Sequence, residues 1–168
     1  MLAWSDGDFL EALENAFGFR LGRFRRVGAR WCYPLSRVRA KQQSVERVVF
    51  LGNAAHGLHP VAGQGFNLSL RDAAGLAECI ADHGMEDPGA APVLSRYSAW
   101  RRGDQRATAY FSDALIRIFG NPLQPVRLAR NLGLLGLELF PPARAAVARQ
   151  GMGLARSVPR LARGVPLA

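Results

Sequence analysis

The sequence predicts an α+β chain that is mostly helical. Residues 47–51 form a strand-like run that is apolar from Val48 on and ends at a glycine, and a glycine-rich loop (53–65) and a helical pattern follow it. This order indicates a strand, a turn and a helix. A longer helical pattern covers residues 92–119 and closes at Gly120-Asn121-Pro122, and helical pieces broken by proline and glycine occupy residues 123–168.

The remaining elements follow from the same signals. Residues 6–17 predict a helix that Asp6 or Asp8 caps and Gly18 ends, and residues 20–40 predict extended structure. The 47–51 strand should be buried on both faces. The helix after the loop should cover 66–82 and bury one stripe, namely Leu68, Ala73, Leu76, Ala77 and Ile80. We therefore expect three parts, over residues 1–46, 47–91 and 92–168.

Composition limits the class of protein. The chain has 168 residues, of which 49% are hydrophobic and 21% charged, so it is globular and of single-domain size. The longest apolar stretch, 132–137, is stopped by Glu138 and is too short to span a membrane. Cys32 and Cys79 lie far apart, which predicts two buried thiols rather than a disulfide framework or a zinc site. A reducing, cytoplasmic location is expected.

Positive charge is concentrated in the second half. The net charge is +9, and Lys41 is the one lysine among 22 basic residues. Residues 92–168 hold 12 arginines against 3 acidic residues. Arginine suits anionic partners such as lipid head groups or a phosphate-bearing cofactor, although a solvated basic face is an equal alternative. Nucleic acid is not an expected partner, because the sequence contains no helix-turn-helix or aromatic-interleaved basic pattern.

The loop after the predicted strand is the candidate site. Gly52 allows a sharp turn, and Gly63 and Gly65 expose backbone N–H groups where the next helix begins. The helix dipole adds partial positive charge there, so a planar or anionic ligand with acceptor atoms is expected. We expect positive φ at Gly65. An ordinary loop rich in small residues remains the alternative on spacing alone.

The segment from Gly52-Asn53-Ala54-Ala55-His56 through 59–68 to Arg71-Asp72-Ala73 resembles a known fingerprint. It is similar to the second flavin fingerprint of aromatic-ring hydroxylases of the para-hydroxybenzoate hydroxylase type, and within that superfamily to the ubiquinone-biosynthesis hydroxylases. The resemblance implies the C-terminal part of that FAD/NAD(P)-binding fold. The N-terminal Rossmann unit, with its Gly-x-Gly-x-x-Gly turn, has no counterpart in this sequence.

The resemblance also implies which residues face FAD. The FAD-binding residues would be Gly52, Asn53, Pro60, Gly63, Gln64, Gly65, Phe66 and Asn67. Asn53 departs from the family's usual aspartate, and an amide makes a weaker contact to a ribitol hydroxyl than a carboxylate does. The Gly-Asn pair looks like the branch that hydroxylates 2-polyprenyl-6-methoxyphenol. No catalytic acid or base can be assigned. His56 and His59 lack a third ligand for a metal.

The implied function is that of a flavoprotein monooxygenase, an oxidoreductase that uses FAD and NAD(P)H to hydroxylate a polyprenylated phenol. Both cofactors would need the N-terminal part, so the chain alone should bind FAD weakly or not at all and be inactive. Further expected partners are the inner face of a membrane and a ubiquinone-biosynthesis complex. The alternative is a non-catalytic, truncated remnant whose basic tail, residues 144–168, binds membrane or protein partners.

Overall fold

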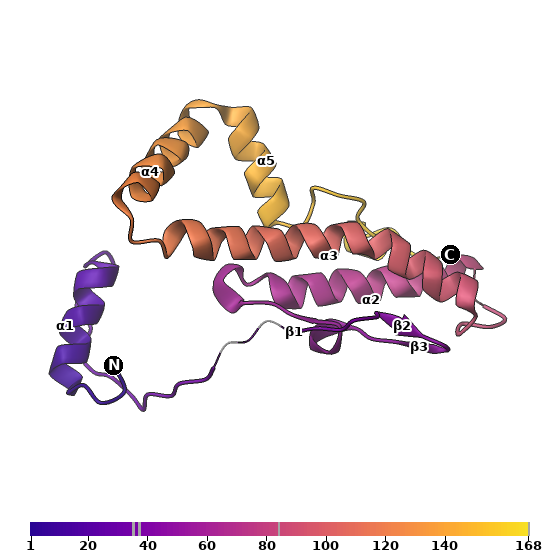
Figure 1. Cartoon of the computed structure of the whole chain (residues 1–168), viewed down its shortest axis with the longest axis horizontal. Coiled ribbons are helices and arrows are strands. Elements are labelled where there is room, and N and C mark those ends of the chain that lie inside the picture. The colour runs from indigo at the N-terminus through magenta and orange to yellow at the C-terminus, as the bar shows by residue number, and fades with distance from the viewer. Residues whose placement is uncertain (35, 37, 84, 168) are drawn as a thin grey trace. The chain divides into compact units, whose positions relative to one another are not determined.

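The computed structural model describes residues 1–34, 36, 38–83 and 85–167. Its contacts divide the chain into two compact units, Met1–Leu35 and Ser36–Ala168. The boundary between these units follows residue 35, whereas the sequence predicted boundaries after residues 46 and 91; those two boundaries stay predictions. The described residues are mostly helical with two small sheets, as expected (Figure 1).

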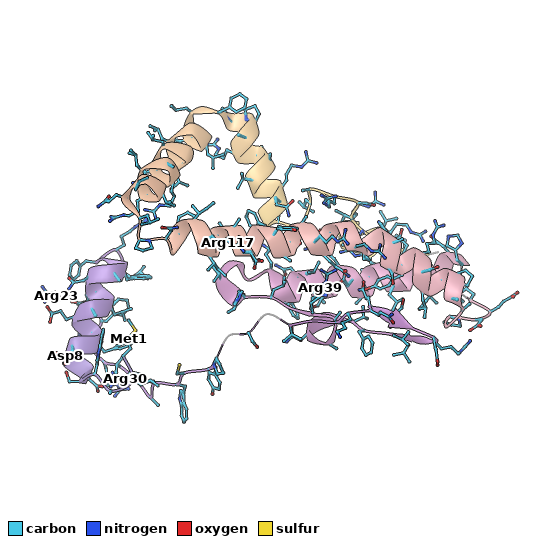
Figure 2. All side chains as sticks on the ribbon, in the orientation of Figure 1. Met1, Asp8, Arg23, Arg30, Arg39 and Arg117 are labelled. Atoms are coloured by element: carbon cyan, nitrogen blue, oxygen red, sulfur yellow. The ribbon has the colours of Figure 1, made fainter. Side chains whose placement is uncertain are left out.

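The first unit is built on α1 (Asp6–Phe17), whose bounds agree with the predicted helix. Ser5, not an aspartate, is the N-cap: its side chain accepts a hydrogen bond from the Asp8 N–H at 3.1 Å. Arg30 holds its segment against the start of α1 through an ion pair with Asp6 at 2.9 Å. It also donates to the Met1 carbonyl, and Figure 2 labels Arg30 close to Met1. Residues 23–34 carry no regular element, and Cys32 is exposed rather than buried.

The second unit contains two short antiparallel pairs. Strand β1 (Val38–Arg39) pairs with β4 (His56–Gly57), and β2 (Ser44–Val45) pairs with β3 (Val48–Val49). Extended structure was predicted for residues 20–40. Among the described residues of this range only β1 is a strand, and residues 35 and 37 lie outside the described part of the chain.

The strand expected to be buried on both faces is a two-residue hairpin strand instead. Val48 is 55% exposed and Phe50 is also exposed, whereas Val49 and Leu51 pack against the core. Alternate side chains therefore point in opposite directions, as they do in any strand that has a core on one side only. The expectation of double burial was wrong because β3 is covered on a single face.

Two long helices lie side by side and form the body of this unit. They are α2 (Gln64–His83) and α3 (Ala91–Phe119), close to the predicted 66–82 and 92–119 (Figure 1). The core cluster between them and β3 contains Cys79, Val93 and Tyr97. Cys79 is buried, as expected.

The last third of the chain is helical and then irregular. Helix α4 (Gln124–Leu139) is followed by α5 (Pro141–Gly151), and the break falls at the predicted Pro141-Pro142 pair. Residues 152–163, which we call the strap, run along α2 and end in a short 3-10 turn, η3 (Leu161–Arg163). The described residues include no helix that is both long and apolar enough to cross a membrane.

Candidate functional site

The first part of the site is the turn that follows β3. Gly52 has φ of 58°, which an L side chain rarely adopts, so the predicted sharp turn is confirmed at this residue. It begins a 3-10 turn, η1 (Gly52–Ala54), whose end is closed by the Ala55 N–H donating to the Gly52 carbonyl at 3.0 Å. A Cβ on Gly52 would lie 3.5 Å from the Ser69 hydroxyl of α2. The Gly52-Asn53 turn thus lies against the first turns of α2.

The second part is the loop that leads into α2. A 3-10 turn, η2 (Pro60–Ala62), ends at Gly63 in the left-handed region with φ of 61°, and α2 begins at the next residue. Gly63 therefore carries the positive φ that we expected at Gly65. Gly65 lies in the first turn of α2, and a Cβ there would meet no atom within 4 Å. The glycine that the turn requires is Gly63.

The predicted site residues divide into an exposed and a buried group. Asn53, Pro60, Phe66 and Asn67 are exposed, with Phe66 at 72%, beside the first-turn N–H groups of α2 that have no partner within the helix. This surface offers an aromatic ring, a proline, two amides and a helix N-terminus. It is therefore open to a planar ligand that carries acceptor atoms.

Gln64 belongs to the buried group. Its side chain is 6% exposed, and its Nε2 donates a hydrogen bond to the Gly151 carbonyl at the end of α5. Its Oε1 is buried and has no hydrogen-bond partner in the described part of the chain. Gln64 thus connects the loop to the C-terminal segment instead of facing the open surface.

Behind the loop lies a buried ion cluster, which comprises Arg71 and Asp72 of α2 and Arg101 and Asp104 of α3. Arg101 and Asp72 are both fully buried, and Arg101 Nε donates to Asp72 Oδ1 at 2.7 Å. Arg101 also binds Asp104, which Arg71 Nε contacts at 3.0 Å. Gln105 supplies Asp72 with a further donor at 2.9 Å. Each buried charge therefore has an opposite charge within bonding distance.

Sequence reasoning missed most of this cluster. It included Arg71 and Asp72 only as part of the fingerprint, and it gave no role to the α3 members. The signal that could have found them is spacing: buried positions of α3 continue from Val93 and Tyr97 at intervals of three or four to Arg101, Asp104 and Thr108. Polar residues on the apolar line of a helix indicate partners on the facing helix.

Two glycines make room for the arginines. A Cβ on Gly75 would lie 2.9 Å from Arg101 Cδ, and a Cβ on Gly153 of the strap would overlap the Arg71 guanidinium at 2.1 Å. Gly153 also has φ of 71°. The strap continues along α2, where the Arg160 N–H donates to Glu78 Oε2 at 2.6 Å and its side chain pairs with Asp82.

These contacts revise the expected role of the tail. Arg160 is engaged with α2, and Gly153 and Pro159 are buried, so this part of residues 144–168 is packed on the fold. It is also irregular from residue 152 to residue 160, which agrees with the predicted helical pieces broken by proline and glycine. The basic tail of the alternative therefore consists of the end of α5 followed by the packed strap and the last residues, and its binding to a membrane or protein stays a prediction.

His56 lies at the edge of the ion cluster. Its Nε2 is 3.4 Å from Asp72 Oδ2 and has no hydrogen-bond partner among the described residues. Burial lowers the pKa of His56 below its ordinary 6.5; nearby Asp72 opposes this effect and Arg101 reinforces it. His56 is thus neutral at neutral pH. The pKa of Arg101 is raised: burial acts to lower it, but the contacts with Asp72 and Asp104 outweigh burial.

A basic cleft adjoins the site on the β1 side of α3. Its volume is about 680 Å³, and its lining includes Arg39, Lys41, Arg102 and Arg106. None of the eight predicted FAD-binding residues lines it, although His56 does. The site predicted from the sequence is therefore an open surface next to this cleft.

Comparisons with known proteins agree with the resemblance read from the loop. A profile of the FAD binding domain family matches residues 9–112. Ubiquinone hydroxylase UbiL of Rhodospirillum rubrum is 44% identical over 172 residues, which cover 99% of this chain and 40% of the relative. The 3-demethoxyubiquinol 3-hydroxylase of Escherichia coli is 34% identical over 140 residues, covering 82% of this chain and 36% of that protein. The chain spans about two fifths of the length of these relatives.

Proposed function

Because the chain belongs to the family of FAD-binding domains, we propose that it forms the flavin-facing part of a monooxygenase that hydroxylates a polyprenylated phenol in ubiquinone biosynthesis. The observation that carries the proposal is the geometry of the loop. Gly63 adopts a left-handed conformation directly before α2 begins, and the neighbouring Pro60 and Phe66 are exposed. The names of the relatives, UbiL and the 3-demethoxyubiquinol hydroxylase, support the choice of substrate class.

The residues present fit FAD. No side chain projects from Gly63 or Gly65, and a Cβ on either would meet no atom within 4 Å, so a flat ring has access to the backbone. Asn67 and Asn53 present exposed amides that both donate and accept hydrogen bonds. We assign Pro60, Gly63, Gly65, Phe66 and Asn67 to the flavin ring. Gly52 and Asn53 would face the ribitol, as the resemblance implies.

The protein's own contribution is binding and electrostatics. When bound and reduced by NAD(P)H, FAD supplies the redox chemistry that activates O2 for ring hydroxylation. The N–H groups and dipole of the α2 N-terminus favour negative charge on whatever the loop holds. Gln64 holds the loop to α5 through the Gly151 carbonyl, which makes it a positioning residue. The buried ion cluster fixes α2 against α3 and thereby fixes the direction of the helix N-terminus.

The test compares two glycines of matched backbone. Gly63 and Gly164 have φ of 61° and 74°, and a Cβ on either would meet open space, but only Gly63 lies in the loop. A chimera would join the N-terminal part of UbiL to this chain, and FAD occupancy would be read from flavin absorbance after purification. Gly63→Val should lower FAD affinity by about tenfold or more, because it adds a branched side chain at the ring surface.

Gly164→Val should keep the FAD occupancy of the parent chimera, since it carries the same backbone strain away from the loop. Substrate-dependent oxidation of NAD(P)H by the parent chimera would support the hydroxylase activity. Equal FAD occupancy in the two variants would refute the placement of the flavin at this loop. A parent chimera that folds and binds no FAD would refute the proposal as a whole.

A further inference from the structure

An ordered line of exposed leucines runs along α4. Leu128, Leu132, Leu135 and Leu139 are spaced by four, three and four residues, and their exposed fractions lie between 54% and 75%. At about 100° per residue this spacing gathers the four side chains within roughly 60° of the helix circumference. We call these four residues the leucine stripe.

The leucine stripe points away from α3 and α5, the helices that α4 contacts. The most protected residues of α4 are Val126, Arg130 and Leu137, which are half-buried where α4 contacts α3 and α5. The same helical geometry places these three about 180° from the stripe. None of the described residues of α4 is fully buried. The helix is therefore held by one side and offers its apolar line to the surroundings.

The surroundings of the stripe are basic. Residues 120–152 contain four arginines and one acidic residue, Glu138. Arg130 lies over the Phe119 ring on the side away from the stripe, whereas Arg127, Arg144 and Arg149 are exposed. Glu138 lies 3.6 Å from Arg144, and both side chains are more than half exposed. Exposed Leu123 and Phe140 extend the apolar surface at the two ends of α4. An occupant of this surface must accept leucine side chains and offer negative charge.

We propose that α4 lies on the surface of an anionic lipid bilayer, with the leucine stripe at the boundary of the acyl chains and the exposed arginines among the head groups. An amphipathic helix with leucine on one face and arginine beside it has this mode of binding. A second copy of the chain fits less well, because pairing two stripes would bring two arginine-rich hairpins of +9 chains together. The inference goes beyond the proposed function and does not depend on FAD.

The experiment measures sedimentation of the 168-residue chain with vesicles. One set contains equal parts of phosphatidylcholine and phosphatidylglycerol, and the other contains phosphatidylcholine alone. The test variant is Leu132→Gln/Leu135→Gln. The control, Val48→Gln/Leu70→Gln, removes two apolar side chains of similar exposure, 55% and 54%, from other elements. Circular dichroism and the urea midpoint establish that each variant is folded.

We expect binding to the anionic vesicles that weakens as salt is raised. The stripe variant should bind about tenfold more weakly or worse, because two leucines leave the apolar contact, while the control binds like the parent. Arg127→Gln should weaken binding about fivefold, the share of one arginine at such a surface.

Three outcomes would overturn the proposal. The first is equal binding of the stripe variant and the parent to anionic vesicles. The second is binding of the parent to phosphatidylcholine vesicles as strong as to the anionic mixture. The third is a dimer, seen by sedimentation velocity without lipid, that Leu132→Gln/Leu135→Gln dissociates. That result would assign the stripe to a second copy.

Discussion

Replacing Arg101 by methionine should destabilise the fold more than any change on its surface. The guanidinium of Arg101 is fully buried between Asp72 and Asp104. Methionine keeps most of the stem that packs beside Gly75, so the change removes charge and donors with little loss of volume. After it, Asp104 retains Arg71, but among the residues described Asp72 retains only Gln105 and the neutral His56.

The expected loss is about 3–5 kcal/mol, the cost of leaving one member of a buried ion pair without its partner. For a chain of this length, 3 kcal/mol corresponds to a fall in Tm of roughly 6–12 °C. Adding Asp72→Asn removes the uncompensated charge, so the double variant should lose less than the sum of the two single changes. We expect that coupling to be at least about 1 kcal/mol.

Urea unfolding followed by circular dichroism measures the free energies of unfolding. Arg106→Met is the control, because Arg106 lies on the same helix with an exposed side chain. It should cost no more than about 0.5 kcal/mol. A loss below about 1 kcal/mol for Arg101→Met, or strict additivity with Asp72→Asn, would show that the ion cluster does not hold α2 to α3. The account of how the loop is oriented would then fail.

Two further predictions concern the strap and His56. Gly153→Ala should lower the free energy of unfolding by about 2 kcal/mol or more, because its Cβ would overlap the Arg71 guanidinium at a φ of 71°. Gly164→Ala has a similar φ but open space around its Cβ, so it should cost about 1 kcal/mol. Urea midpoints of the two variants are compared, and equal losses would contradict the contact between the strap and Arg71. His56 binds a proton less readily in the folded chain than in the unfolded one, so its contribution to stability is present above pH 6.5 and is lost as the pH falls below it. His56→Gln should therefore flatten the decline of the urea midpoint below pH 6.5, and an unchanged decline would be contrary to the burial of a neutral imidazole.

The helices of this chain could be predicted because their signals are local. The bounds of α1 agree with the prediction, α3 begins one residue before it, and the break before α5 falls at Pro141. Caps, prolines and glycines determine such ends from a few neighbouring residues. The loop was predictable for the same reason, since the left-handed turns at Gly52 and Gly63 require glycine. The prediction misplaced one turn, from Gly63 to Gly65, because both glycines suit it equally in sequence.

The buried face of α2 could not be predicted from apolar residues alone. The expected stripe included Ala73, which is exposed, and Ala77, which is only half-buried. The buried face actually follows Leu68, Asp72, Gly75 and Cys79. A charged residue appears as a surface residue in a hydrophobic pattern, and its burial depends on a partner 29 residues away in α3. The predicted buried face of α2 is therefore rotated about the helix axis by about a quarter to a third of a turn from the observed one.

The end of α5 and the strap hold α2 through three separate contacts. Gln64 binds the Gly151 carbonyl at the start of α2, Gly153 covers Arg71 two turns later, and Arg160 binds Glu78 near the far end. The three contacts come in the same order along α2 and along residues 151–160, so the two segments run side by side in the same direction. A displacement of α2 relative to α3 would disturb both the ion cluster and the strap. The N-terminus of α2, where we place the flavin ring, is therefore held from two sides by residues other than those we assign to the flavin.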